Sequence, residues 1–167
     1  MPDHDLAQLN IARLAAPLDS PALADFVASL DRINALAEAS PGFVWRFETP
    51  AGNATAADHP FGDDMIVNLS TWRSVASLHD YVYRSAHAAI MARRREWFAR
   101  IEEAYTVLWW VAEGHRPTPF EAAERLERLH REGPGAAAFT FKRPWPAPGS
   151  VGTGDTAGPF DDLCPAT

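Results

Sequence analysis

The chain has 167 residues, with 15 Lys and Arg against 22 Asp and Glu, which gives a formal net charge of −7 at pH 7. A chain of this length is expected to form one compact domain, not two. The acidic balance leaves no basic surplus for gripping phosphate backbones, which argues against nucleic-acid binding. Because Cys164 is the single cysteine, an intramolecular disulfide and a thiolate metal cage are excluded.

The first ten residues, MPDHDLAQLN, contain neither a basic segment nor an apolar run. They therefore do not resemble a signal peptide. No stretch reaches the roughly 20 apolar residues that a helix needs to span a bilayer. We expect a cytoplasmic protein without a membrane partner.

The N-terminal part is predicted to be a strand followed by a helix. Residues 6–14, LAQLNIARL, mix apolar and polar side chains in near alternation, which predicts a strand. Apolar residues then recur at helical spacing over residues 21–39. Ser20 can cap this helix, and the SPG sequence at 40–42 ends it.

Two further strands are predicted next, over residues 42–49 and 64–72. The first of them alternates strictly and therefore places Phe43, Trp45 and Phe47 on one side.

The second half is predicted to hold two helices and at least one strand. One long helix is expected from about residue 74 to 100, followed by a strand over 105–114. The sequence TPFE at 118–121 is a capping box with proline at the first helical position, and the helix FEAAERLERLHREG is expected to end at Gly133. A short final strand is expected within 137–145.

The chain therefore divides into a folded domain, residues 1–145, and a tail, residues 146–167. The tail is dominated by Pro, Gly, Ala, Ser, Thr and Asp and lacks periodicity, which predicts a flexible segment.

This order of elements predicts an α+β fold, a ferredoxin-like split β-α-β antiparallel sheet with an extra C-terminal helix and a short strand. Both long helices then cover one face of the sheet. Large apolar residues on several strands make the other face too hydrophobic for a one-sided monomer. Two sheets packed face to face in a twofold homodimer would cover it.

The long helix carries polar residues on its apolar face. At about 100° per residue, an arc of roughly 120° contains Tyr83, His87, Ile90, Met91, Arg94, Trp97, Phe98 and Ile101. Arginine does not lose its proton, so a buried Arg94 needs a carboxylate, carbonyl groups or an anionic ligand. An ion pair of Arg94 with Glu48 or Asp64, and a satisfied core histidine at His87, are the structural alternatives to a site.

Other polar residues are expected in the same layer between helices and sheet. Asn10, Arg46 and Asn68 lie within three predicted strands, and Asn34 lies on the inner face of the first helix. With the two helix residues they would line an apolar pocket with a few fixed polar groups, the usual form of a small-molecule site. Ordinary exposed polarity is the alternative for each residue taken singly.

Aromatic residues on the long helix add to this candidate pocket. Tyr83, Trp97 and Phe98 are placed to flank a planar ligand, and packing in the core is the alternative for each.

Four segments carry a family resemblance, namely LAQLNIARL, ASPGFVWRF, VNLSTWRSVASLHDYVYRSAHAAIMARRREWF and LWWVAEGHRPTPFEAAERLERLHREGP. Over about residues 6–145 the chain resembles a domain family of unknown function, DUF3291, of the dimeric α/β-barrel superfamily. The resemblance implies the ferredoxin-like dimer and supplies no catalytic residue.

The wider superfamily is similar in architecture to cofactor-free antibiotic-biosynthesis monooxygenases and to haem enzymes in which a helical histidine ligates iron. We therefore expect an oxygenase-like small-molecule tailoring enzyme, either cofactor-free or haem-dependent through His87. His87 would act as general acid/base or as the iron ligand, while Arg94 and Arg46 would hold a carboxylate or an oxyanion. A non-catalytic ligand-binding homodimer and a purely structural homodimer are the alternatives.

Overall fold

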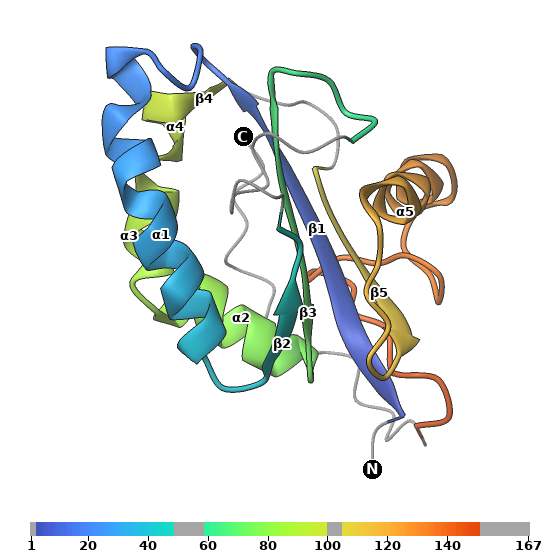
Figure 1. Cartoon of the computed structure of the whole chain (residues 1–167). Coiled ribbons are helices and arrows are strands. Elements are labelled where there is room, and N and C mark those ends of the chain that lie inside the picture. The colour runs from blue at the N-terminus through green and yellow to red at the C-terminus, as the bar shows by residue number, and fades with distance from the viewer. Residues whose placement is uncertain (1–2, 49–58, 100–104, 151–167) are drawn as a thin grey trace.

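A computed structural model describes residues 3–48, 59–99 and 105–150 of the chain (Figure 1). It has an α+β fold in which an antiparallel sheet of five strands is covered by helices. In chain order the elements are β1 His4–Leu14, η1 Pro21–Leu23, α1 Ala24–Ala39, β2 Phe43–Arg46, β3 Met65–Trp72, α2 Val75–Arg84, α3 His87–Ala92, α4 Arg94–Trp97, β4 Phe98–Ala99, β5 Thr106–Ala112 and α5 Pro119–Glu132.

Strand β1 is at the centre of the sheet. It pairs with β3 along one edge, and β3 in turn pairs with β2. Along its other edge β1 pairs with β5 and, near its end, with the short β4. Since all pairs are antiparallel, the α1 crossover joins two parallel strands, β1 and β2, and the crossover through α2 to α4 joins β3 to β5 in the same way.

The strand predictions at 6–14, 64–72 and 105–114 are confirmed to within a few residues by β1, β3 and β5. The helix predicted after the capping box at 118–121, ending at Gly133, is confirmed by α5. Its cap is local, because the Thr118 hydroxyl accepts a hydrogen bond from the backbone nitrogen of Glu121 at 3.1 Å.

The prediction of one long helix is wrong. The chain leaves the helix at Ser85, whose backbone is extended at φ −103° and ψ −180°, and resumes as α3 and α4. The Ser85 hydroxyl donates to the carbonyl of Tyr81 and accepts from the backbone nitrogen of His87. A hydroxyl that bonds the backbone in this way competes with the helical ladder. The residues of the predicted arc therefore do not share one helix face.

The prediction that Phe43, Trp45 and Phe47 lie on one side is also wrong. The register of β2 against β3 shifts between Phe43 and Trp45, and such a bulge reverses side-chain facing. Phe43 packs edge-on against Trp72 with ring centroids 5.4 Å apart. Trp45 and Phe47 pack in the core on the opposite face.

Helices cover both faces of the sheet (Figure 1). Helices α1 to α4 lie over one face, and α5 lies over the other, where Leu126 and Leu129 pack on strand residues that include Leu9 and Trp109. Leu9 and Trp109 are fully buried within the one chain. The sheet face that was expected to need a second subunit is thus covered by α5.

The final strand expected within residues 137–145 is reduced to isolated bridges, one of which joins it to the sheet. Leu108 and Phe139 exchange two backbone hydrogen bonds of 2.9 and 2.8 Å at the edge of β5. Most of the predicted tail, residues 151–167, lies outside the described residues. In the described part of the chain, no helix combines the length and the apolar character that crossing a membrane requires.

Candidate functional site

The sheet carries polar side chains on the face that points toward α1 to α4. The register places Arg46, Ser70 and Gln8 side by side on β2, β3 and β1. These residues share their face with Trp72, which packs in the core under α2. One step along the strands, the same face presents Asn68, Asn10 and Thr106, again as direct neighbours.

Hydrogen bonds organise this polar face. Gln8 Nε2 donates to Ser70 Oγ at 3.1 Å, and the indole nitrogen of Trp72 donates to the same oxygen at 2.9 Å. Asn10 Nδ2 donates to Thr106 Oγ1 at 2.8 Å. Gln8 and Ser70 are buried, whereas Asn68 is exposed. The polar face is therefore closed at its Ser70 end and open to solvent at Asn68.

The sequence analysis identified Asn10 and Asn68 on this face but missed Gln8, Ser70 and Thr106. Gln8 precedes Asn10 by two residues and Ser70 follows Asn68 by two. Strand periodicity puts residues two apart on one face, so this signal was present in the sequence. Thr106 has no such signal, because only the pairing of β5 with β1 brings it to Asn10.

Arg46 lies on the predicted face but is not a free cation. Its Nε lies 2.7 Å from Glu38 of α1, its Nη2 lies 2.5 Å from Glu48, and its side chain is 17 % exposed. Two carboxylates more than balance the guanidinium charge. Arg46 therefore connects α1 to β2 and is poorly suited to hold an anion.

His87 is the first residue of α3, and its ring is held in one orientation. Nδ1 lies 3.2 Å from the carbonyl oxygen of Val82, and the ring centroid lies 4.8 Å from that of Tyr81. A carbonyl only accepts, so Nδ1 carries the proton and Nε2 carries a lone pair. Within the described ranges, Nε2 has no hydrogen-bond partner.

The surroundings of His87 favour its neutral form. Burial lowers the pKa of His87 below 6.5, and the hydrogen bond to Val82 opposes this only in part. The half-buried imidazole is consequently neutral at neutral pH and offers a basic nitrogen.

Tyr81, not Tyr83, is the tyrosine beside His87. Its ring stacks on Trp72 at 5.1 Å and so links His87 to the sheet. Burial raises the pKa of Tyr81, so the phenol keeps its proton and donates to the carbonyl of Ile33 at 3.4 Å. Tyr83 packs against His79 and Phe141.

Arg94 is half-buried at the start of α4. Neither carboxylate considered from the sequence pairs with it, because Glu48 binds Arg46 and Asp64 binds Arg13 at 3.3 Å. Across the described residues Arg94 makes no ion pair or hydrogen bond. Its guanidinium is therefore available to an anionic group.

The other predicted site residues are placed in different ways. Asn34 is half-buried on α1. Trp97 is 1 % exposed, packs on Phe26 at 5.5 Å and carries the guanidinium carbon of Arg93 4.7 Å above its ring. Phe98 contacts the same Phe26 edge-on at 5.0 Å. Trp97 and Phe98 thus pack in the core between α1 and α4.

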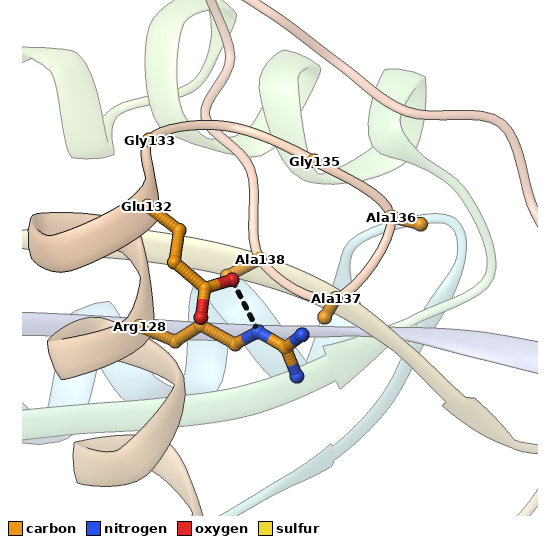
Figure 2. Close-up of a pocket in the computed structure, with 7 residues that line it drawn as sticks. All are labelled: Arg128, Glu132, Gly133, Gly135, Ala136, Ala137 and Ala138. Carbon is orange, nitrogen blue, oxygen red and sulfur yellow. Dashed lines mark hydrogen bonds and ion pairs between the residues drawn. The ribbon is translucent and has the colours of Figure 1, made fainter.

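The cavities of the described structure include one at an edge of the sheet and one at the end of α5. One, of about 300 Å³, is lined by Glu38, Phe43, Trp45, Arg46, Glu48 and Arg116 at the edge strand β2. The other, of about 150 Å³, lies at the end of α5, where Arg128 pairs with Glu132 beside a loop of glycines and alanines (Figure 2). Neither cavity is lined by His87 or Arg94.

The described residues supply one donor atom suited to haem iron, Nε2 of His87. A ligating histidine usually donates its other N–H to a carbonyl or carboxylate, as His87 does to Val82. Tyr81 packs against one side of the imidazole. Over the same residues, no group of three or more His, Cys, Asp or Glu is arranged to hold a metal ion.

Comparison with known proteins places the chain among uncharacterised relatives. The family model described as "Domain of unknown function (DUF3291)" matches residues 5–153. No curated protein matches the chain.

Two solved structures are similar to the chain. The NE2512 protein of unknown function from Nitrosomonas europaea is 20% identical, with a TM-score of 0.44 over 71% of this chain and 98% of that one. PA3566 from Pseudomonas aeruginosa is 11% identical, with a TM-score of 0.45 over 69% of this chain and 99% of that one. At TM-scores below 0.5 these similarities assign no function.

Proposed function

The chain belongs to the DUF3291 family, and we propose that it is a small-molecule tailoring enzyme of the oxygenase-like, cofactor-free kind with His87 as its general base. The observation that carries this proposal is the state of the imidazole. Val82 holds the Nδ1 proton, Nε2 keeps its lone pair, and burial keeps the ring neutral. Because His87 is half-buried and Nε2 has no partner in the described structure, this basic nitrogen is open to a substrate.

In the proposed reaction, Nε2 of His87 removes a proton from an acidic phenol or enol substrate. Neutral imidazole has a suitable basicity for this step near neutral pH. Arg94 binds the resulting oxyanion through its guanidinium, which has no other partner in the described structure. Asn10 and Asn68 orient the polar groups of the substrate on the open end of the sheet face.

We also propose that the sheet is of the ferredoxin-like type. The order β2, β3, β1, β5 and the two crossovers support this assignment. A homodimer would have to use a surface other than the face under α5, and a light-scattering mass at micromolar concentration tests for it.

Oxygen uptake with a panel of phenolic and enolic compounds tests the proposed function. We expect uptake by the wild-type protein and a loss of about 100-fold or more in His87→Gln. Arg94→Gln should lose activity as well, whereas Arg95→Gln and His130→Gln, which alter exposed side chains, serve as matched controls. Circular dichroism establishes that each variant is folded.

Two outcomes would contradict the proposal. Unchanged turnover in folded His87→Gln would remove His87 as the base, and compounds that bind without turnover would favour the non-catalytic ligand-binding alternative. A Soret band in protein purified with haem, lost in His87→Ala, would replace the cofactor-free reaction by the haem-dependent one.

A further inference from the structure

The cavity beside the edge strand β2 combines charged and aromatic side chains. Its volume of about 300 Å³ is at the small end of the range for ligand pockets, roughly 300 to 1,000 Å³. Two aromatic and four charged side chains line it, namely Phe43, Trp45, Glu38, Arg46, Glu48 and Arg116. This cavity does not involve His87 or Arg94.

Arg116 supplies a cation on a fixed loop. The backbone nitrogen of Gly114 donates to Asp5 at 2.9 Å, and His115 Nε2 donates to Glu121 at 2.8 Å. These contacts hold the backbone on the N-terminal side of Arg116. The Arg116 guanidinium itself makes no ion pair or hydrogen bond in the described part of the chain. The exposed guanidinium of Arg116, which lines the cavity, is therefore available to an anionic group of a ligand.

The carboxylates supply the opposite charge. Glu38 and Glu48 each use Oε1 to bind Arg46, and each carboxylate keeps acceptor capacity on Oε2 for a further hydrogen bond. Two carboxylates and the guanidinium of Arg46 leave one net negative charge. Arg116 adds one positive charge, so the cavity presents both signs at once.

The aromatic side chains supply the apolar wall. Because the register shifts between Phe43 and Trp45, the two rings lie on opposite faces of the sheet and both border the cavity at its edge. Both are only partly buried. A ligand with an apolar or aromatic group would bury the remaining ring surface.

We infer that this cavity binds a small zwitterion of the α-amino-acid class with an apolar or aromatic side chain. Arg116 binds the carboxylate of the ligand, and the free oxygens of Glu38 and Glu48 bind its ammonium group. A simple anion would be repelled by the two carboxylates, and a simple amine would gain nothing from Arg116. The inference is independent of the proposed reaction at His87.

Isothermal titration calorimetry of the full chain with phenylalanine tests this inference. Phenethylamine lacks the carboxylate and 3-phenylpropionate lacks the ammonium group, so both should bind at least about tenfold more weakly than phenylalanine. Arg116→Gln should weaken the binding of phenylalanine about tenfold and leave the binding of phenethylamine unchanged. Glu48→Gln should weaken the binding of phenylalanine but not that of 3-phenylpropionate. Arg128→Gln, at the other cavity, is the matched control.

Several results would overturn the inference. One is equal affinity for the three compounds, and another is no heat of binding for phenylalanine at millimolar concentration. A third is an equal loss of phenylalanine affinity in Arg116→Gln and Arg128→Gln. None of these results bears on oxygen uptake, which depends on His87, so the inference and the proposed reaction can fail separately.

Discussion

The carbonyl oxygen of Val82 lies 3.2 Å from Nδ1 of His87 and thereby determines which nitrogen of the imidazole is basic. Ser85 makes this contact possible, because the chain leaves α2 at this residue and His87 starts α3. An uninterrupted helix would have used the Val82 carbonyl in its own backbone ladder. The break in the helix and the state of the histidine are therefore one structural feature.

This feature predicts a pH dependence of stability. His87 and His79 both have pKa values lowered below 6.5, chiefly by burial. At pH values between the folded-state pKa and 6.5, the unfolded chain binds more protons than the folded chain. The contribution of the two histidines to the free energy of unfolding is therefore complete above about pH 6.5 and is lost as the pH falls below it. The urea midpoint should therefore fall between pH 7 and pH 5.

A histidine variant separates the two contributions. His87→Gln should show a smaller fall of the urea midpoint than the wild type over the same pH range, whereas His130→Gln, on the exposed side of α5, should keep the wild-type fall. A His87 pKa at or above 6.5 by NMR titration would contradict the prediction.

Gly42 is predicted to tolerate no side chain. Its φ of +82° is a conformation that favours glycine, and an added Cβ would overlap the hydroxyl of Ser77. Gly133 has a similar φ of +75° but nothing within 4 Å of an added Cβ. Gly133→Ala should lower the free energy of unfolding by about 1 kcal/mol, because alanine disfavours this backbone conformation. Gly42→Ala should lower it by about 1–3 kcal/mol more, because of the overlap with Ser77. Chemical denaturation measures both, and equal losses would show that Ser77 moves away freely.

Local patterns in the sequence were sufficient for much of the fold. Alternation over residues 6–14 and 64–72 identified β1 and β3, and Thr118 identified the start of α5, because these signals lie within a few residues of the element they specify. The break at Ser85 was missed, since helical spacing continues through it and a single hydroxyl decides it. The bulge between Phe43 and Trp45 was missed because the alternation of side chains in the sequence continues through it.

The sequence pattern did not predict contacts between residues that are far apart in the chain. Nothing local shows that α5 packs on the far face of the sheet or that Glu38 and Glu48 neutralise Arg46. Wheel geometry selected Tyr83 in place of Tyr81 because it assumed one continuous helix. His87 and Arg94 are half-buried, and the contacts around them could be found only from the tertiary structure.

Asp5 is predicted to be a major stabilising contact at the end of the sheet where β1 begins. It is fully buried, and its carboxylate accepts hydrogen bonds of 2.9 Å from Arg73 and from the backbone of Gly114. Asp5→Asn should leave one of these donors without an acceptor, at a cost of about 1–3 kcal/mol. Glu113→Gln is the control, because Glu113 binds the same Arg73 at 2.7 Å while 55 % exposed, and it should cost under about 1 kcal/mol. Similar losses in the two variants would contradict the prediction.

Trp97 is predicted to stabilise the fold and not to bind a ligand. It is 1 % exposed and lies between Phe26 and the guanidinium of Arg93, which also binds Asp25 at 3.1 Å. Trp97→Ala should therefore lower the free energy of unfolding by roughly 3–5 kcal/mol.

The matched control for this prediction is Trp145→Ala. Trp145 is 44 % exposed, and what it offers Trp110 is its backbone carbonyl, which the substitution keeps. Trp145→Ala should lower the free energy of unfolding by about 1 kcal/mol or less. Trp97→Phe should recover part of the stability lost in Trp97→Ala, because a ring still fills the space against Phe26. If Trp97→Ala unfolds at the wild-type urea concentration, α4 does not pack on α1 as described, and Trp97 returns to the set of candidate ligand-binding residues.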